Sequence, residues 1–561
     1  AINSTKVEKM TAGQIRSMTT SQVSALSTLQ VSVLTSEQVS AMTAAQVASL
    51  TKAGVAALGT DAVASLTVAQ AKALTTTQIA ALTTAQVQQL NTAQLGALSA
   101  LQMGAMETGD LRKLSADQLQ SISTAALKSL TSAQLTNLTA EQVASLKTSQ
   151  VKALSNSQLQ ALTTAQVAAM STDQVAALTT AQIASIESAD LVSIKAEALA
   201  SLNTSQIRAL TNSQMSVLTA DQLSHLTTAQ IASGLTTTQV TGIKISNLSS
   251  LSTSQIRALT TGQVSALSSF ALNNFGVDQI AAMSTAQVRA INTGMINTLD
   301  STHLQALSTA SMSSLKTDQI NRFTPEQMAS LTGEQVASLT TTQVVALTTT
   351  QVASLTAEQV ASLTKNQVKS MEAADFAVIK AAALSALGTE QITGLTVAQV
   401  AKLTTAQASA LTLDQVGALS SAQVAALDTA DLAVMSRDQI KSFVASGITA
   451  LGAKVSKLTS TQIADLTTAQ SKALTNTQIA SLATSQISGL SADSIGSWNA
   501  SQVAALTTAS IAQLSADQVG AIKASALANL STTQLSKIAT TSMGGLTTEQ
   551  ISRLTPTQFN G

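Results

Sequence analysis

An eight-residue repeat constrains this chain more than any other feature. Residues 339–370 read LTTTQVVA LTTTQVAS LTAEQVAS LTKNQVKS, and an apolar residue recurs every eight positions from Ile2 onward. About 70 such units cover residues 2–561, with one extra residue at Gly234 and one unit, 451–457, that is one residue short. No linker or change in composition interrupts them, so we expect a single continuous repeat domain over 1–561.

The period of eight excludes the two simplest secondary structures. A continuous α-helix would drift by about 80° per unit, so no apolar face would persist. A plain strand would place the two strongest apolar positions, the first and the sixth, on opposite faces. A short helix followed by a turn fits the period, and the consensus unit L-T-T-A-Q-V-A-A is numbered here from position one to position eight.

Four signals place the helix within each unit. Thr or Ser at position two and Gln at position five form the capping box S/T-x-x-Q. Pro325 and Pro556 both stand at position three, which the register makes the first helical residue, where proline is tolerated best. Acidic residues favour position four, as in Glu326, and basic residues favour positions seven and eight, as in Lys369, and both placements suit the helix dipole.

These helices of about six residues are too short to persist alone, because isolated helices below about 12 residues are marginal in water. We therefore predict an all-α solenoid of about 70 very short capped helices, in which each unit is stabilised by its neighbours. Positions one and six form the predicted core, and the small residue at position seven allows close approach. Two helices per 16-residue coil is the favoured arrangement and predicts a rod of about 300 Å; three helices per coil would make a shorter, wider rod.

The composition limits the partners of this solenoid. The chain has 29 basic and 29 acidic residues, and its Lys and Arg are scattered, so no basic cluster could follow a nucleic-acid backbone. The same scatter argues against an anionic membrane surface, and no apolar run reaches the length of a membrane span. There is no Cys, so disulfides stabilise nothing. Because the chain begins at Ala1 almost in phase with the repeat, we expect a processed product or a piece of a longer protein.

A search for reactive groups predicts no catalytic, cofactor-binding or metal-binding residue, no cofactor, and therefore no enzyme. His225 and His303 lie about ten units apart, and His303 replaces the usual Gln, which indicates a variant helix cap. Trp498 occupies a position-one slot and is expected in the core. The sequence contains no phosphate-binding glycine loop, no nucleophile elbow and no calcium-binding nonapeptide.

A few units carry charge at positions where most carry Thr or Gln. Four have an acid at position two and Asp at position five: 106–113, 186–193, 371–378 and 427–434. Three have Lys at position two: 194–201, 379–386 and 522–529. We expect the acids to replace Thr as caps and neighbouring charges, such as Glu187 with Lys195, to form weak ion pairs. The alternative is that these units mark the register for lateral or partner docking.

The units LTTAQVAA (162–169), LTTAQIAS (178–185) and LTAEQVAS (355–362) resemble the degenerate L-T/S-x-x-Q-V/I-x-x tracts of very large bacterial secreted and cell-surface repeat proteins. This resemblance extends over the whole chain. It implies an exported bacterial protein of the kind found among extracellular adhesins, surface layers and filament components.

We therefore expect a non-enzymatic extracellular structural protein that self-assembles into a filament, sheath or surface layer. Its low charge favours association over solubility. The expected partner is the chain itself, with the cell surface or glycans as further candidates. One alternative is the spacer or stalk of a bacterial adhesin. A minor alternative is an ice- or surface-binding array built from the Thr residues at position three.

Overall fold

The computed structural model describes residues 2–560, and within them the chain is all-helical, with no strand. There are 65 α-helices, from α1 (Ser4–Glu8) to α65 (Pro556–Asn560), and each begins at position three of its unit and ends at position six, seven or eight. Four 3₁₀-helices, η2 (Ile245–Ser250), η3 (Ile296–Thr298), η4 (Gly452–Lys457) and η5 (Thr540–Gly545), and one π-helix, η1 (Gln230–Gly234), occupy the remaining units. The predicted fold class is confirmed.

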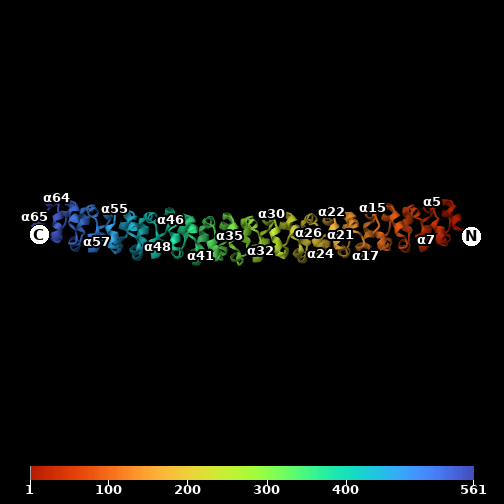
Figure 1. Cartoon of the computed structure of the whole chain (residues 1–561), viewed down its shortest axis with the longest axis horizontal. Helices are drawn as coiled ribbons and strands as arrows, with labels where there is room; N and C mark the ends of the chain where they lie inside the picture. The colour runs from red at the N-terminus through yellow and green to blue at the C-terminus, as the bar shows by residue number, and fades with distance from the viewer. Residues whose placement is uncertain (1, 561) are drawn as a thin grey trace. The chain divides into compact units, whose positions relative to one another are not determined.

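The chain divides into two compact units, residues 1–283 and residues 284–561. Within each unit the short helices follow one another in chain order as stacked coils (Figure 1). The expectation of one continuous repeat domain over 1–561 stays a prediction.

Each helix begins where the capping box placed it. At the start of α6 (Ala44–Ser49), the Thr43 N–H donates to Gln46 Oε1 at 2.7 Å, and the Gln46 N–H donates to Thr43 Oγ1 at 3.2 Å. The same reciprocal pair recurs in most units, and Pro325 and Pro556 are each the first residue of a helix. Because the cap pairs two backbone N–H groups that an isolated turn would leave open, it defines the start of most helices.

The apolar core consists of the side chains at positions one and six of each octapeptide. Val at position six is almost completely buried, as for Val39 and Val47 at 0% exposure, and Leu at position one is nearly so, as for Leu50 at 4%. Positions one and six are therefore the core, as predicted. Position five is also buried, so the glutamines that cap the helices lie inside the protein. The sequence analysis did not predict this third buried position.

Helices pack against the helix three units away. The contacting pairs include α2 (Ala12–Ser17) with α5 (Ser36–Ala41), and α6 with α9 (Val68–Ala73). The same packing occurs in the second compact unit, as in α39 (Gly333–Ala337) with α42 (Ala357–Ser362). The glutamine side chains reach still further, to the helix four units earlier. One coil therefore holds between three and four helices, and the prediction of two helices per 16-residue coil is wrong.

The physical reason for the wider coil is the length of the linking segment. The helix ends two to four residues before the next N-cap, and position one adopts extended backbone, as at Leu50 (φ −59°, ψ 139°). One extended residue turns the chain but does not reverse it, so an antiparallel helix pair cannot form. The chain instead closes a coil after three to four turns of this kind.

Two irregular units absorb the changes in repeat length. The extra residue Gly234 converts the end of its helix into a π-turn, in which the Leu235 N–H donates to the Gln230 carbonyl at 2.9 Å. The short unit 451–457 is wound as the tighter helix η4, and its Gly452 has the only positive φ among residues 2–560, +56°. A wider turn takes up one residue and a tighter turn makes up for a missing one.

Candidate functional site

The most regular chemical feature of the protein is a ladder of buried glutamine amides. Gln46 Nε2 donates to the carbonyl oxygens of Ile15 at 3.1 Å, Arg16 at 3.1 Å and Met18 at 2.6 Å. These carbonyls end α2, four units earlier. The same Gln46 caps its own helix through Oε1, so one side chain satisfies the start of one helix and the end of another. We call this contact the glutamine ladder.

The ladder tolerates other donors at the same place. Asn247 Nδ2 donates to Leu218 O at 2.9 Å, and Ser542 Oγ donates to Leu514 O at 2.6 Å. In the short unit, Lys454 Nζ donates to both Ala425 O and Leu427 O at 2.7 Å. The carbonyl groups at each helix end therefore form a slot that accepts an amide, a hydroxyl or an ammonium group. Sequence analysis found only the capping role of Gln. The available signal was that most units have Gln at position five, while the N-cap at position two varies among Thr, Ser and Asn.

Four units place Asp in this slot. Asp110, Asp190, Asp375 and Asp431 are all buried. Asp110 Oδ1 accepts the Thr84 hydroxyl at 2.6 Å, and Asp190 Oδ1 accepts the Thr164 hydroxyl at 2.8 Å. An ionised Asp has no N–H or O–H to donate, so the ladder is interrupted at these places.

The expected capping and ion pairing of the charged units are only partly realised. Asp428 caps its helix by accepting the Asp431 N–H at 2.8 Å, as predicted. The longer Glu107, Glu187 and Glu372 make no such bond, so the prediction that these acids act as caps is wrong. Within residues 2–560, no ion pair joins Glu187 to Lys195 or Glu372 to Lys380.

Successive units face different directions around the coil, which explains the missing ion pairs. Side chains of units three apart are the ones that meet. Arg437 and Asp465, which stand three units apart, do form an ion pair, and the hydrogen bond between them lowers the pKa of the Asp465 carboxyl.

The two histidines lie in separate surroundings. His303 is buried in the position-five slot, and its Nδ1 lies 2.6 Å from Asp300 Oδ1. Partial burial raises the pKa of Asp300, but bonds from the Thr302 hydroxyl and from His303 outweigh it and hold that pKa at about 2. His225 lies near the surface, with Nδ1 2.9 Å from the Asp221 carbonyl. No group of three or more His, Cys, Asp or Glu side chains suited to a metal occurs in residues 2–560.

Trp498 is a fully buried core residue, as the register indicated. Its Nε1 donates to Ser471 Oγ at 3.0 Å and to Ser471 O at 3.1 Å. Ser471 stands at position six, where most units have Val, so a small hydroxyl residue leaves room for the indole and supplies its hydrogen-bond acceptor. The large Trp498 side chain on one helix is thus compensated by the small Ser471 side chain on another.

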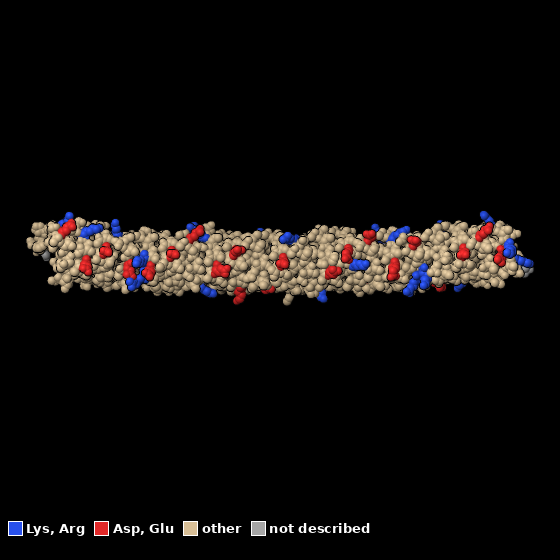
Figure 2. All heavy atoms as spheres, turned by 45° about the horizontal axis from the view of Figure 1, so that its top comes forward, with Lys and Arg blue, Asp and Glu red and all other residues tan. Residues whose placement is uncertain are grey.

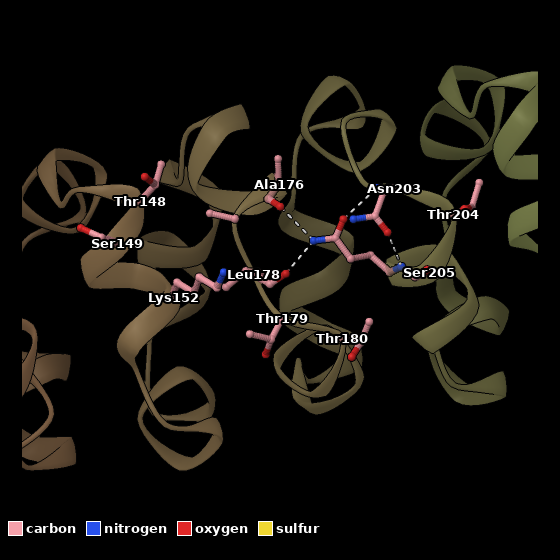
Figure 3. Close-up of a pocket in the computed structure, with 12 residues that line it drawn as sticks. Thr148, Ser149, Lys152, Ala176, Leu178, Thr179, Thr180, Asn203, Thr204 and Ser205 are labelled. Atoms are coloured by element: carbon pink, nitrogen blue, oxygen red, sulfur yellow. Dashed lines mark hydrogen bonds between the residues drawn. The ribbon is translucent and has the colours of Figure 1, made fainter.

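One groove lies in the first compact unit, between α19 (Thr148–Ala153), α23 (Thr180–Ser185) and α26 (Thr204–Ala209) (Figure 3). Its wall includes Thr148, Thr179 and Thr180, and Lys152 is the one ionisable side chain among its lining residues. Gln206, Ala176 and Leu178 also line the groove, and Gln206 Nε2 donates to Ala176 O at 2.9 Å and to Leu178 O at 2.6 Å. The groove offers hydroxyl groups and one ammonium group, which can form hydrogen bonds.

Charged side chains are spread thinly over the surface, and in Figure 2 they stand mostly singly or in small groups of mixed sign. No helix among residues 2–560 has the length and apolar character needed to cross a membrane.

Comparison with known protein families supports the interpretation of this chain as a degenerate repeat protein. Six stretches match the family model described as the ALTTAQ repeat: residues 103–140, 151–185, 183–220, 296–333, 334–365 and 368–405. These stretches contain the units LTTAQVAA and LTTAQIAS, and they lie in both compact units. No curated protein matches the chain.

Two solved or assembled structures are among those that the chain matches, both at low similarity. One is the leucine-rich repeat-containing protein LegL7 from Legionella pneumophila, at 13% identity and a TM-score of 0.12, covering 44% of this chain and 77% of that one. The other is a homology model of the full-length AP-3 complex in an intermediate open conformation, at 10% identity and a TM-score of 0.14, covering 94% of this chain and 84% of that one. TM-scores this low carry no argument about function.

Proposed function

We propose that this chain is a non-enzymatic extracellular structural protein, a rod-like solenoid that self-assembles into a filament, sheath or surface layer. A structural role fits a repeat protein built as a helical solenoid. The observation that carries the proposal is the glutamine ladder, which uses the most abundant buried polar side chain to join helices to one another.

The ladder also suggests how copies could join. Gln14 and Gln22 have no helix four units earlier within residues 2–560, and no hydrogen bond reaches their Nε2 groups. Around them lies a hollow lined by apolar side chains that include Met10, Met18 and Leu26. Within residues 1–561 taken alone, this first coil offers amide donors beside an apolar surface.

The last coil offers the complementary groups. Position-one carbonyls such as those of Ile538 and Leu546 receive no side-chain amide from any described residue, and a second hollow is lined by Leu535, Met543 and Phe559. Donors and apolar side chains at one coil thus match acceptors and apolar side chains at the other. A head-to-tail contact of this kind is heterologous and extends into a fibre.

Negative-stain electron microscopy of residues 1–561 at several concentrations tests self-assembly. We expect fibres or sheets that grow with concentration, and their loss in the double variant Met10→Glu/Met18→Glu, which places charge on the first coil. Leu101→Glu, on a side chain that is 78% exposed at position four, is the matched control and should leave the fibres intact. Circular dichroism confirms that each variant folds.

Single particles at every concentration would overturn self-assembly and favour the spacer or stalk of an adhesin. The extracellular location is tested separately, by immunogold labelling of intact cells that produce the protein. Label confined to the cell interior would contradict it.

An ice- or surface-binding row of Thr has weaker support. Position three is mostly exposed, but successive units turn by roughly a quarter to a third of a circle around the coil, so their Thr side chains face different directions. A flat row would need the same residue type every three to four units. We therefore place this alternative below the other two.

A further inference from the structure

Two of the interrupted ladder positions, one in each compact unit, have features that the others lack. Asp110 and Asp431 occupy the glutamine slot with side chains 3% and 1% exposed. Asp110 Oδ2 is buried and has no hydrogen-bond partner. Asp431 Oδ2 accepts only a long bond of 3.4 Å from the Asp428 N–H.

The carbonyl groups that a glutamine would serve are also left without a side-chain donor. By the spacing of the ladder these are the carbonyls of Ile79 and Leu82 for Asp110, and those of Val400 and Leu403 for Asp431. No side chain among residues 2–560 donates to them, whereas the carbonyls of their regular counterparts receive a glutamine Nε2. Each site therefore combines a buried carboxyl group with helix-end carbonyls that lack a donor.

We propose that Asp110 and Asp431 are proton-controlled joints of the solenoid. When the carboxyl group is protonated, its O–H donates to the helix-end carbonyl and takes the place of the glutamine N–H. When the proton leaves, carboxylate and carbonyl oxygens face each other without a hydrogen atom between them, and the helix separates locally from the helix four units earlier.

The surroundings of Asp110 favour the protonated form, mainly because the carboxyl group is buried. Its packing partners α11 (Thr84–Gln89) and α17 (Ser132–Thr136), and α10 (Thr76–Ile79) across the slot, carry no ionisable side chain. Its own unit carries Glu107, Arg112 and Lys113. Burial raises the pKa of Asp110, the Thr84 hydroxyl lowers it in part, and the charge of Glu107 raises it further.

Asp431 has a similar setting on α51 (Thr429–Val434). Burial raises its pKa to about 6, and the charge of Asp428 adds to the effect. The partner α48 (Thr405–Ala410) carries no ionisable side chain, and η4 carries Lys454 and Lys457. Lys454 is engaged with Ala425 O and Leu427 O.

Two further groups complete the charged surroundings of Asp431. Lys402, which follows α47 (Val397–Val400), is exposed, and Asp465, which follows α54 (Ser460–Ala464), is paired with Arg437.

The sign of the pH effect follows from these directions. The folded carboxyl binds its proton more tightly than the unfolded chain, whose Asp has the ordinary pKa of 3.8. The stabilisation is fully present below that pKa and is lost as the pH rises through about 6. A difference of about two pKa units corresponds to about a hundredfold change in the equilibrium for local opening, so a tenfold to hundredfold change is expected between pH 4 and pH 8.

Hydrogen–deuterium exchange of the full chain, measured by mass spectrometry and corrected for intrinsic exchange, tests the proposal. Peptides covering 398–404 and 427–436 should lose protection at least about tenfold between pH 4 and pH 8. Peptides from a regular unit, such as 162–169 with Gln166, should not change. Asp431→Gln should remove the pH response and keep the pH 4 protection at pH 8.

Two further variants make the result decisive. Asp431→Asn supplies a shorter amide, for which Asn247 is the precedent in this chain, and should also remove the response. Asp414→Asn changes an exposed position-four carboxyl and should leave the response intact. Equal protection of wild-type 427–436 at both pH values, or a response that persists in both amide variants, would overturn the proposal.

Discussion

Two copies of the same octapeptide, LTTAQIAS, adopt different structures in this protein. Residues 178–185 contain the regular helix α23, whereas residues 226–233 run into the π-turn η1. The eight letters are identical, but the second copy is followed by the extra residue Gly234. The local sequence of a unit therefore does not by itself decide how its helix ends.

What the two copies share is the glutamine ladder. Gln182 Nε2 donates to Leu154 O at 2.8 Å, and Gln230 Nε2 donates to Leu202 O at 2.6 Å. Their N-terminal caps also agree, with Thr N–H to Gln Oε1 at 2.8 Å in the first copy and 2.7 Å in the second. The N-terminal half of the unit is fixed by its own cap and by the glutamine contact to the earlier helix. The extra residue is therefore accommodated in the C-terminal half.

The short unit extends the comparison in the other direction. Its helix η4 is wound more tightly, and it keeps a donor in the slot by using Lys454 instead of glutamine. Both irregular units therefore change their helix type and preserve the contact to the earlier helix. The ladder contact is the feature the solenoid keeps when its repeat length changes.

The largest effect is expected from replacing the ladder donor itself. Gln182→Glu keeps an oxygen to cap its own helix but turns the donor into an acceptor that faces buried carbonyls. We expect a loss of about 2–4 kcal/mol in local stability at pH 7, measured by hydrogen exchange over residues 150–156 and 178–186.

Gln230→Glu, the same change in the second copy, is the matched comparison. Because the ladder contacts are alike, its loss should agree with that of Gln182→Glu within about 0.5 kcal/mol. A much smaller loss at Gln230 would show that the π-turn relieves the contact and would break the comparison.

Lys454→Met should have the next largest effect. The variant keeps an unbranched chain of similar volume but leaves Ala425 O and Leu427 O without their donor, which costs about 1–3 kcal/mol. Protection of residues 424–428 is the measurement. Lys457→Met, on an exposed lysine of the same unit, should change that protection little.

Gly452→Ala should destabilise the short unit by about 1 kcal/mol, because a Cβ disfavours the φ of +56° found there. No atom lies within 4 Å of the added Cβ, so the effect would come from the backbone and not from a clash. Gly59→Ala, another open glycine with φ of −60°, serves as the control in urea or thermal unfolding. Equal stability of both variants would contradict the prediction.

Deletion of Gly234 should have the smallest effect on stability. It tests most directly whether this residue causes the difference between the two LTTAQIAS copies. The second copy would then be followed at once by the next unit, as the first copy is, and we expect an α-helix in place of the π-turn. Stability should change by less than about 1 kcal/mol, since the ladder and the caps are unchanged. Backbone amide chemical shifts of residues 230–235 would report the conversion, and shifts that still indicate a π-turn would contradict it.

Much of this architecture could be predicted from short-range patterns. The reciprocal Thr–Gln cap and proline at the first helical position are local features of one unit, and the apolar period that marks positions one and six for burial can be read from the octapeptide. The core placement of Trp498 followed in the same way from the position that it occupies in the repeat.

The features that could not be predicted are contacts between units. The sequence favoured two helices per coil because nothing within an octapeptide reports how far the chain turns at position one. It also missed the second role of Gln, since the carbonyls that Gln46 serves lie 28 to 31 residues earlier. For the same reason the ion pair expected between Glu187 and Lys195 is absent, whereas Arg437 finds Asp465 three units away.

The sequence alone determined that this protein is a solenoid of short capped helices, because cap chemistry and apolar period act within eight residues. Only the tertiary structure decided how many helices make a coil, which end of which helix each glutamine serves, and how an extra or missing residue is absorbed. Those outcomes depend on packing between units three and four apart, where the hydrogen-bond partners of a side chain are backbone carbonyls that every residue type possesses.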